Sequence, residues 1–238
     1  MGQETWWKIW QSHLRDYLES LPRAGFFIYE YLRSIRNSLE IACGSSKDSI
    51  YLSKRGIFVV ATDYEVRLIN HLKNRFSHSN LFYQVADAFK LPFKENAFDL
   101  VFHNGFFILF NNNNDIYVLL KEQERVSRKY ILFFVHNKLN LKLVNNFSKR
   151  ASNDPLYNIR FFKPEEVLDI VKNSGIRMRS VKILKFGGLF DYIFSKKIQK
   201  VIPNPLYSFI IKIIPRLYQI QAWGKTERIA CIIELCKK

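Results

Sequence analysis

Residues 38–63 read SLEIACGSSKDSIYLSKRGIFVVATD, and the prediction of the fold starts from this stretch. A short apolar run, 39–43, turns at Gly44 into a polar helical segment, and a second apolar run, 57–61, leads to Asp63. This order predicts a strand, a tight turn, a helix and a parallel strand that ends at an acid. Such a unit binds a nucleotide-like ligand on its first turn, with the acid close to the ribose hydroxyls.

The rest of the chain continues this alternation of apolar strands and amphipathic helices. Predicted helices cover 65–76, 112–127 and a segment that begins at 163, and further strands cover 81–85, 98–103, 129–135, 181–186 and 227–235. Alternating strands and helices are typical of an α/β fold with a parallel sheet. We therefore predict a doubly wound, mostly parallel seven-stranded sheet.

Two helical additions flank this pattern, and we interpret 1–238 as a single domain that includes both. Residues 1–36 predict an N-terminal helical cap, which either closes the ligand crevice or only covers one face of the sheet. Residues 187–226 are rich in Phe, Tyr, Ile and Lys and are too long for a hairpin. They predict a helical insertion before the last strand, with helices broken at Pro203, Pro205 and Pro215.

The positive charge is concentrated in the second half of the chain. The net charge is +16; residues 1–120 hold 13 Lys/Arg and 12 Asp/Glu, whereas residues 121–238 hold 24 and 9. Such an asymmetry indicates contact with nucleic acid, an anionic membrane surface or a negatively charged substrate. The alternative is a basic surface that only meets solvent.

The cysteines and the apolar runs restrict the class of protein. Cys43, Cys231 and Cys236 fit neither a disulfide framework nor a zinc pattern, so we expect a reducing, cytoplasmic compartment and no metal. No apolar run approaches the roughly 20 residues that would span a bilayer. We expect no transmembrane segment, and peripheral association with a membrane stays open.

Four motifs in order carry a resemblance to a known family. They are LEIACGSS at 39–46, Asp63, DAFKLPF at 87–93 and FDLVF at 98–102. Together they resemble class I S-adenosylmethionine-dependent methyltransferases, closest to the type 11 group that includes the ubiquinone- and menaquinone-biosynthesis enzymes. The resemblance covers residues 36–136 and implies a Rossmann-like fold, S-adenosylmethionine as cofactor and methyl transfer as activity.

The first motif would surround the methionine end of the cofactor. Carried over by position, the resemblance assigns this loop to Glu40, Ala42, Gly44, Ser45 and Ser46. Ala42 and Ser46 stand where the family has the first and third glycines of the loop. A dinucleotide pyrophosphate needs several glycines for close backbone approach, so the single Gly44 disfavours a nicotinamide or flavin enzyme.

The later motifs would hold the rest of the cofactor. The resemblance implies that Asp63 accepts hydrogen bonds from the ribose hydroxyls, with Tyr64 beside it. It assigns the adenine to Asp87, Ala88 and Phe89, and it places Asn104 near the reactive methyl group. Asp87 has the alternative role of capping the turn before Leu91.

Methyl transfer from a sulfonium is an in-line displacement that depends mainly on orientation and exclusion of water. The catalytic residues therefore stay unknown. His103 and His136 follow predicted strands four and five, at the edge where ligands bind, and are candidates to deprotonate a hydroxyl acceptor. The alternative for each is a structural histidine.

The acceptor should meet the N-terminal helices and the segments 137–160 and 187–226. The aromatic and aliphatic residues there favour a small apolar molecule, methylated on oxygen, nitrogen or carbon. RNA is an alternative, because lysine and aromatic residues hold phosphates and stacked bases. Leu206 to Tyr218 could also rest on an anionic membrane, or the insertion could simply pack on the sheet. A basic binding protein without activity is the non-enzyme alternative.

Overall fold

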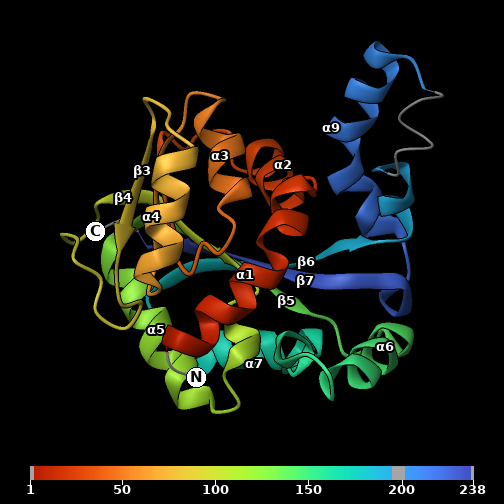
Figure 1. Cartoon of the computed structure of the whole chain (residues 1–238). Coiled ribbons are helices and arrows are strands. Elements are labelled where there is room, and N and C mark those ends of the chain that lie inside the picture. Colours follow the sequence, from red (N-terminus) through yellow and green to blue (C-terminus); the bar gives the residue numbers. More distant parts are fainter. Residues whose placement is uncertain (1–2, 195–201, 237–238) are drawn as a thin grey trace.

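Seven strands form one sheet in the order β3-β2-β1-β4-β5-β7-β6, and β7 is antiparallel to both of its neighbours. The computed structural model describes residues 3–194 and 202–236 of the chain (Figure 1). The strands are β1 Asn37–Glu40, β2 Phe58–Asp63, β3 Leu81–Val85, β4 Phe98–Asn104, β5 Ser127–His136, β6 Met178–Gly188 and β7 Thr226–Leu235. The predicted seven-stranded, mostly parallel sheet is confirmed.

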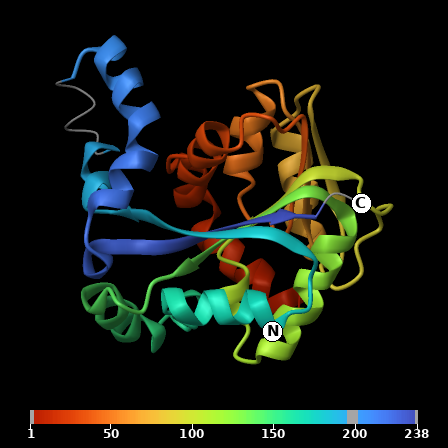
Figure 2. The same cartoon turned by 180° about the vertical axis from the view of Figure 1, so that it is seen from behind.

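Helices cover both faces of this sheet, as Figures 1 and 2 show from opposite sides. The helices are α1 Gln3–Glu19, α2 Arg23–Tyr31, α3 Lys47–Ser53, α4 Val66–Arg75, α5 Asn113–Val126, α6 Leu141–Ala151, α7 Pro164–Asn173 and α9 Asn204–Ile220. Short 3-10 turns lie at η1 Phe107–Leu109, η2 Pro155–Tyr157, η3 Leu189–Phe194 and η4 Trp223–Lys225. One hydrophobic cluster joins α2, α3, α4 and α9 to the sheet, and a second joins α5 and α7 to its other face.

The alternation of side chains along β4 shows how one strand serves both clusters. Leu100 and Phe102 are fully buried against the α2–α4 face, whereas Val101 is buried against the α5–α7 face. A strand that is covered on both sides has a continuous apolar sequence. For this reason the apolar runs of the chain predict these strands.

Two details of the predicted helices are wrong. α2 ends at Tyr31 with Leu32 as its C-cap, so residues 32–36 of the predicted helical cap are not helical. α9 is not broken at Pro215: the helix runs from Asn204 to Ile220 through this residue, which is buried beside Ile214 and Tyr218. A proline removes one backbone hydrogen bond, and the packing of α9 against the sheet offsets that loss. Pro203 and Pro205 lie at the start of α9, and residues 195–201 of the insertion lie outside the described part of the chain.

Asp99, in the FDLVF motif, joins three segments at the amino-terminal edge of the sheet. Its fully buried carboxylate accepts hydrogen bonds from the Arg36 amide at 2.9 Å and from the Arg128 guanidinium at 2.6 and 3.0 Å. Burial opposes the charge, but these donors outweigh it and hold the pKa of Asp99 below its usual value.

We expect Asp99→Asn to lower the free energy of unfolding by about 2 kcal/mol at pH 7, because charge-assisted hydrogen bonds are lost. Since the folded pKa is depressed, this contribution is present above the ordinary Asp pKa and is lost as the pH falls through the folded value. Urea unfolding at pH 7 and at pH 3 should therefore show a smaller difference at pH 3. Glu19→Gln, in the exposed pair with Arg15, is the control and should unfold like the wild type at both pH values.

Candidate active site

A cavity of about 490 Å³ lies where the parallel strands end. Glu40, Asp63, Asn104 and His136 line it from the last positions of β1, β2, β4 and β5. The carboxyl ends of parallel strands are where ligands bind in doubly wound sheets. All the predicted cofactor residues except Ser46 line this one cavity: Glu40, Ala42, Gly44, Ser45, Asp63, Tyr64, Asp87, Ala88, Phe89 and Asn104.

The loop after β1 keeps a glycine-like backbone although only one glycine is present. Ala42, Gly44 and Ser46 have φ angles of 49°, 52° and 55°, in the left-handed region. Ala42 and Ser46 are the positions where the resembled family has glycine, so the backbone conformation persists with side chains attached. A non-glycine residue in this region costs about 1–2 kcal/mol, and such strain is typical of functional loops.

Asp63 fixes this loop from the end of the neighbouring strand. The Gly44 amide donates to one carboxylate oxygen of Asp63 at 3.0 Å, and the Glu65 amide donates to the other at 3.1 Å. Burial raises the pKa of Asp63, and the two amides act in the opposite direction. Each carboxylate oxygen has a further lone pair for a ligand hydroxyl.

Two carboxylates beside the loop provide a test of the predicted cofactor. Glu40 is 3% exposed, and both burial and the nearby Asp48 raise its pKa well above the ordinary value. Asp48 accepts hydrogen bonds from the Gly25 amide at 2.8 Å and from the Asn104 side chain at 3.2 Å. A positive group placed here would relieve the like-charge contact, and S-adenosylmethionine carries an ammonium at its methionine end. The donor set therefore fits this cofactor.

At the predicted adenine end, Asp87 combines its two predicted roles. Its side chain accepts from the Phe89 amide at 2.9 Å and its carbonyl from the Lys90 amide at 3.1 Å, so it caps the turn while lining the cavity. Ala88 is buried, and the ring of Phe89 meets Phe110 edge-on at 5.9 Å. These groups form an apolar slot with one acid at its rim.

Two predicted site residues lie away from the cavity lining. Ser46 is fully buried at the start of α3, because the helix turns its side chain inward. His103 is fully buried between Phe107 and Phe133, at 4.2 and 5.7 Å between ring centroids, and burial lowers its pKa to about 3. The sequence placed His103 at the right edge of the sheet, but strand alternation turns it into the α5–α7 core, so its role as a base is corrected.

The structure adds aromatic residues of α1 that the motifs did not indicate. Trp6, Trp10 and Tyr17 line the cavity, and all three lie within the predicted N-terminal helical cap. A methyl group added to Gly44 would lie 2.5 Å from the Trp10 ring, so the indole is packed directly on the loop. α1 therefore covers the cofactor loop.

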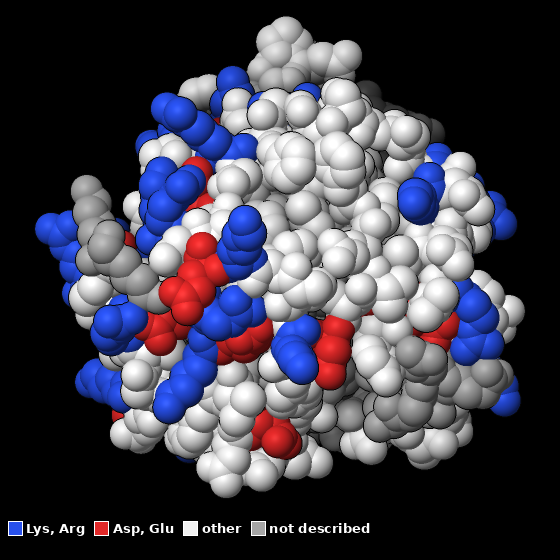
Figure 3. All heavy atoms as spheres, turned by 90° about the vertical axis from the view of Figure 1, so that its left-hand side faces the viewer, with Lys and Arg blue, Asp and Glu red and all other residues white. Residues whose placement is uncertain are grey.

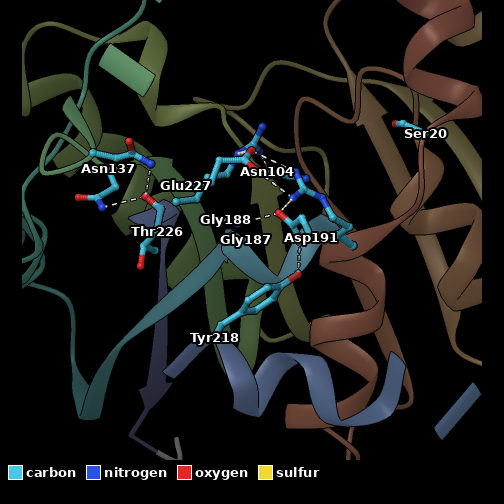
Figure 4. A network of polar contacts seen from close by, with 12 residues as sticks. Ser20, Asn104, Asn137, Gly187, Gly188, Asp191, Tyr218, Thr226 and Glu227 are labelled. Carbon is cyan, nitrogen blue, oxygen red and sulfur yellow. Dashed lines mark hydrogen bonds and ion pairs between the residues drawn. The ribbon is translucent and has the colours of Figure 1, made fainter. Parts of the chain in front are cut away.

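A half-buried network of charges forms another wall of the cavity (Figure 4). Arg23 donates to Glu227 at 2.9 and 3.0 Å and also to Asp191, whose other oxygen accepts from Tyr218. Arg228, the neighbour of Glu227 in the chain, donates to Asn104. Burial opposes the charge of Glu227, but Arg23 and Arg228 outweigh it and hold its pKa well below the usual range. These partners are too far apart in sequence for any local motif to reveal.

Comparison with known proteins agrees with this geometry. Residues 39–134 match the model of the type 11 methyltransferase domain. A search of the curated proteins finds no match. A methyltransferase from Thermotoga maritima, described as S-adenosylmethionine-dependent and a possible histamine N-methyltransferase, is 18% identical with a TM-score of 0.65, over 97% of this chain and 100% of the other.

Two further solved structures have the same fold. An S-adenosylmethionine-dependent methyltransferase from Archaeoglobus fulgidus is 20% identical, with a TM-score of 0.60 over 89% of this chain and 92% of the other. A methyltransferase from Haloferax volcanii, solved in complex with the Trm112 activator, is 12% identical, with a TM-score of 0.63 over 96% and 98%. Residues 39–134 therefore match a methyltransferase domain, and the solved structures share the fold of this chain. Two of these structures are described as S-adenosylmethionine-dependent methyltransferases.

We expect Asp63→Asn to weaken the binding of S-adenosylmethionine about ten- to a hundredfold, because hydrogen bonds to a charged group contribute about 1.5–3 kcal/mol. Asparagine keeps one acceptor for the loop amides, so the fold should persist. Isothermal titration calorimetry measures the effect, and Asp115→Asn on α5 is the matched control outside the lining. Equal affinity of both variants would remove Asp63 from the cofactor site.

We expect Gly44→Ala to cost about 3 kcal/mol of unfolding free energy, from left-handed strain together with the clash against Trp10. In a Trp10→Ala background the same change should cost about 1 kcal/mol, since only the strain remains. Urea unfolding of the four proteins gives this coupling as a double-mutant cycle. An equal cost in both backgrounds would show that φ alone demands glycine at this position.

Proposed function

We propose that this enzyme transfers the methyl group of S-adenosylmethionine to an oxygen, nitrogen or carbon atom of a small, largely apolar acceptor. One observation carries the proposal: the cavity that gathers the cofactor residues also has an aromatic wall. That wall is made of Phe106, Phe110, Phe147, Tyr157, Leu156 and Ile159. Ligand cavities of this size and character, apolar with a few polar groups, take small molecules.

The cofactor supplies an electrophilic methyl group on a sulfonium. The chain supplies orientation and exclusion of water, which account for most of the acceleration in such a displacement. Trp6 and Trp10 of α1 cover the loop side, and the aromatic wall lies on the acceptor side. Electron-rich ring faces also tolerate the positive charge of a sulfonium.

His136 is the candidate for accepting a proton from the acceptor. It lines the cavity at the end of β5, is 4% exposed, and its Nδ1 has no hydrogen-bond partner in the described part of the chain. Burial, followed by the charge of Arg228 directly across from it on β7, lowers the pKa of His136 well below its ordinary value. The ring is therefore neutral near pH 7 and able to accept a proton.

RNA as acceptor remains the second candidate, supported by the excess of 24 Lys/Arg over 9 Asp/Glu in residues 121–238. The aromatic wall and the covering helix α1 favour the small molecule instead, because an RNA site needs an open, basic groove. The Thermotoga neighbour is described as a possible histamine N-methyltransferase, so arylalkylamines belong with phenols and apolar hydroxyl compounds among the acceptors to test.

The proposal is tested by incubating the protein with S-adenosylmethionine and a panel of aromatic hydroxyl compounds, arylalkylamines and an RNA oligonucleotide. Formation of S-adenosylhomocysteine above the acceptor-free rate identifies the class. Turnover on the small molecules is the expected result. Turnover only on RNA, with an affinity that falls steeply with salt, would replace the proposal by the RNA alternative.

With a hydroxyl acceptor, we expect His136→Phe to lower kcat about a hundredfold, as loss of a general base does. The dissociation constant of S-adenosylmethionine should stay unchanged. In the wild type the rate should be flat from pH 6 to pH 9, because the neutral ring is the active form and a lowered pKa keeps it neutral over this range. A rate that rises with a midpoint near pH 6.5 would contradict this assignment.

A further inference from the structure

Two cationic helices, α6 and α9, lie toward the same end of the molecule in both Figure 1 and Figure 2, on opposite faces of the sheet. Neither helix contains an acidic residue, whereas Lys142, Lys149 and Arg150 are exposed on α6 and Lys212 and Arg216 on α9. α6 has no buried residue at all. The opposite end differs: Figure 3 shows Asp and Glu interspersed with the Lys and Arg of that face.

The 187–226 insertion also exposes large apolar side chains that the core does not use. Leu206 and Phe209 on α9 are 51% and 59% exposed, and the exposed fractions of Leu189, Tyr192 and Ile220 are larger still. α9 contacts the protein through Ile214, Pro215 and Tyr218, which are buried on its inner side. A helix that is apolar on its outer side as well needs a partner for that side.

The partner of this surface must offer both apolar groups and negative charges. In the described residues of 187–226 the chain has three cations, Lys212, Arg216 and Lys225, and a single acid, Asp191, which is already held by Arg23. A second copy of this surface would bring like charges together. An RNA strand would satisfy the cations and could stack on Tyr192 and Phe209, but it would leave Leu189, Leu206 and Ile220 exposed to water.

We propose that the outer side of η3 and α9, together with the cationic side of α6, docks on an anionic membrane surface. Leu206 and Phe209 enter the boundary between headgroups and acyl chains, and the flanking cations lie among the anionic headgroups. The association is interfacial: in residues 3–194 and 202–236 no helix is long and apolar enough to cross a bilayer. The docking does not depend on the proposed methyl acceptor.

Sedimentation of the full chain with vesicles, without cofactor, tests this surface. Vesicles of phosphatidylcholine with phosphatidylserine should bind the wild type at least about tenfold more tightly than phosphatidylcholine alone, and salt should weaken the binding. Leu206→Glu with Phe209→Glu should weaken binding about a hundredfold, because apolar burial at two positions is lost. Val118→Glu on α5, where valine is 52% exposed, is the matched control and should bind like the wild type.

A second variant tests the charge separately and covers the case in which the first does not fold. Lys212→Gln and Arg216→Gln should each weaken binding about fivefold, with circular dichroism unchanged. Equal binding to both lipid compositions, no binding to either, or an equal loss in Val118→Glu would overturn the proposal. So would binding to an RNA oligonucleotide instead of vesicles, or a dimer that dissociates in the Leu206→Glu, Phe209→Glu variant. Because no methyl transfer is measured, failure here is distinct from failure of the proposed function.

Discussion

The hydrogen bond from the Gly44 amide to Asp63 is the contact on which the site depends. It is 3.0 Å long and joins the turn after β1 to the end of β2. The parallel register, in which Glu40 pairs with Ala61, brings both segments to the same edge of the sheet. Asp63 is thereby oriented before any ligand arrives, so binding does not have to order the loop. The cost is a half-buried carboxylate, seen in its raised pKa.

The same loop shows which glycine positions of the resembled family's motif accept another residue. Ala42 and Ser46 keep the left-handed backbone with a side chain, at a cost of about 1–2 kcal/mol each. Gly44 has a similar φ, but a Cβ there would also meet the Trp10 ring at 2.5 Å. Strain alone is tolerable when the surrounding sheet determines the backbone, whereas strain with a steric clash is not. Glycine is retained where α1 packs on the loop.

Sequence patterns predicted what depends on local periodicity and on the ends of parallel strands. The apolar runs located all seven strands, and Asp63, Asn104 and His136 line the cavity because they follow such runs. His103 was misassigned because neighbouring residues of a strand face opposite sides, and it shares the α5–α7 side with Val101. The contacts of Trp10 with Gly44 and of Arg23 with Glu227 join segments distant in sequence, and no spacing rule reaches them. α9 continues through Pro215 because tertiary packing overrides a local preference.

The polar network around Arg23 relates the 187–226 insertion to the cavity. Tyr218 of α9 and Asp191 of η3 reach Arg23 of α2, which holds Glu227 of β7. Removing one partner would leave a half-buried charge unpaired, so these contacts hold the inner side of the insertion to the cavity wall. Its outer side has no such constraint within the described structure, and its exposed residues are free to match a partner surface. The inner side of the insertion therefore shapes the cavity wall, whereas its outer side is available for binding outside the site.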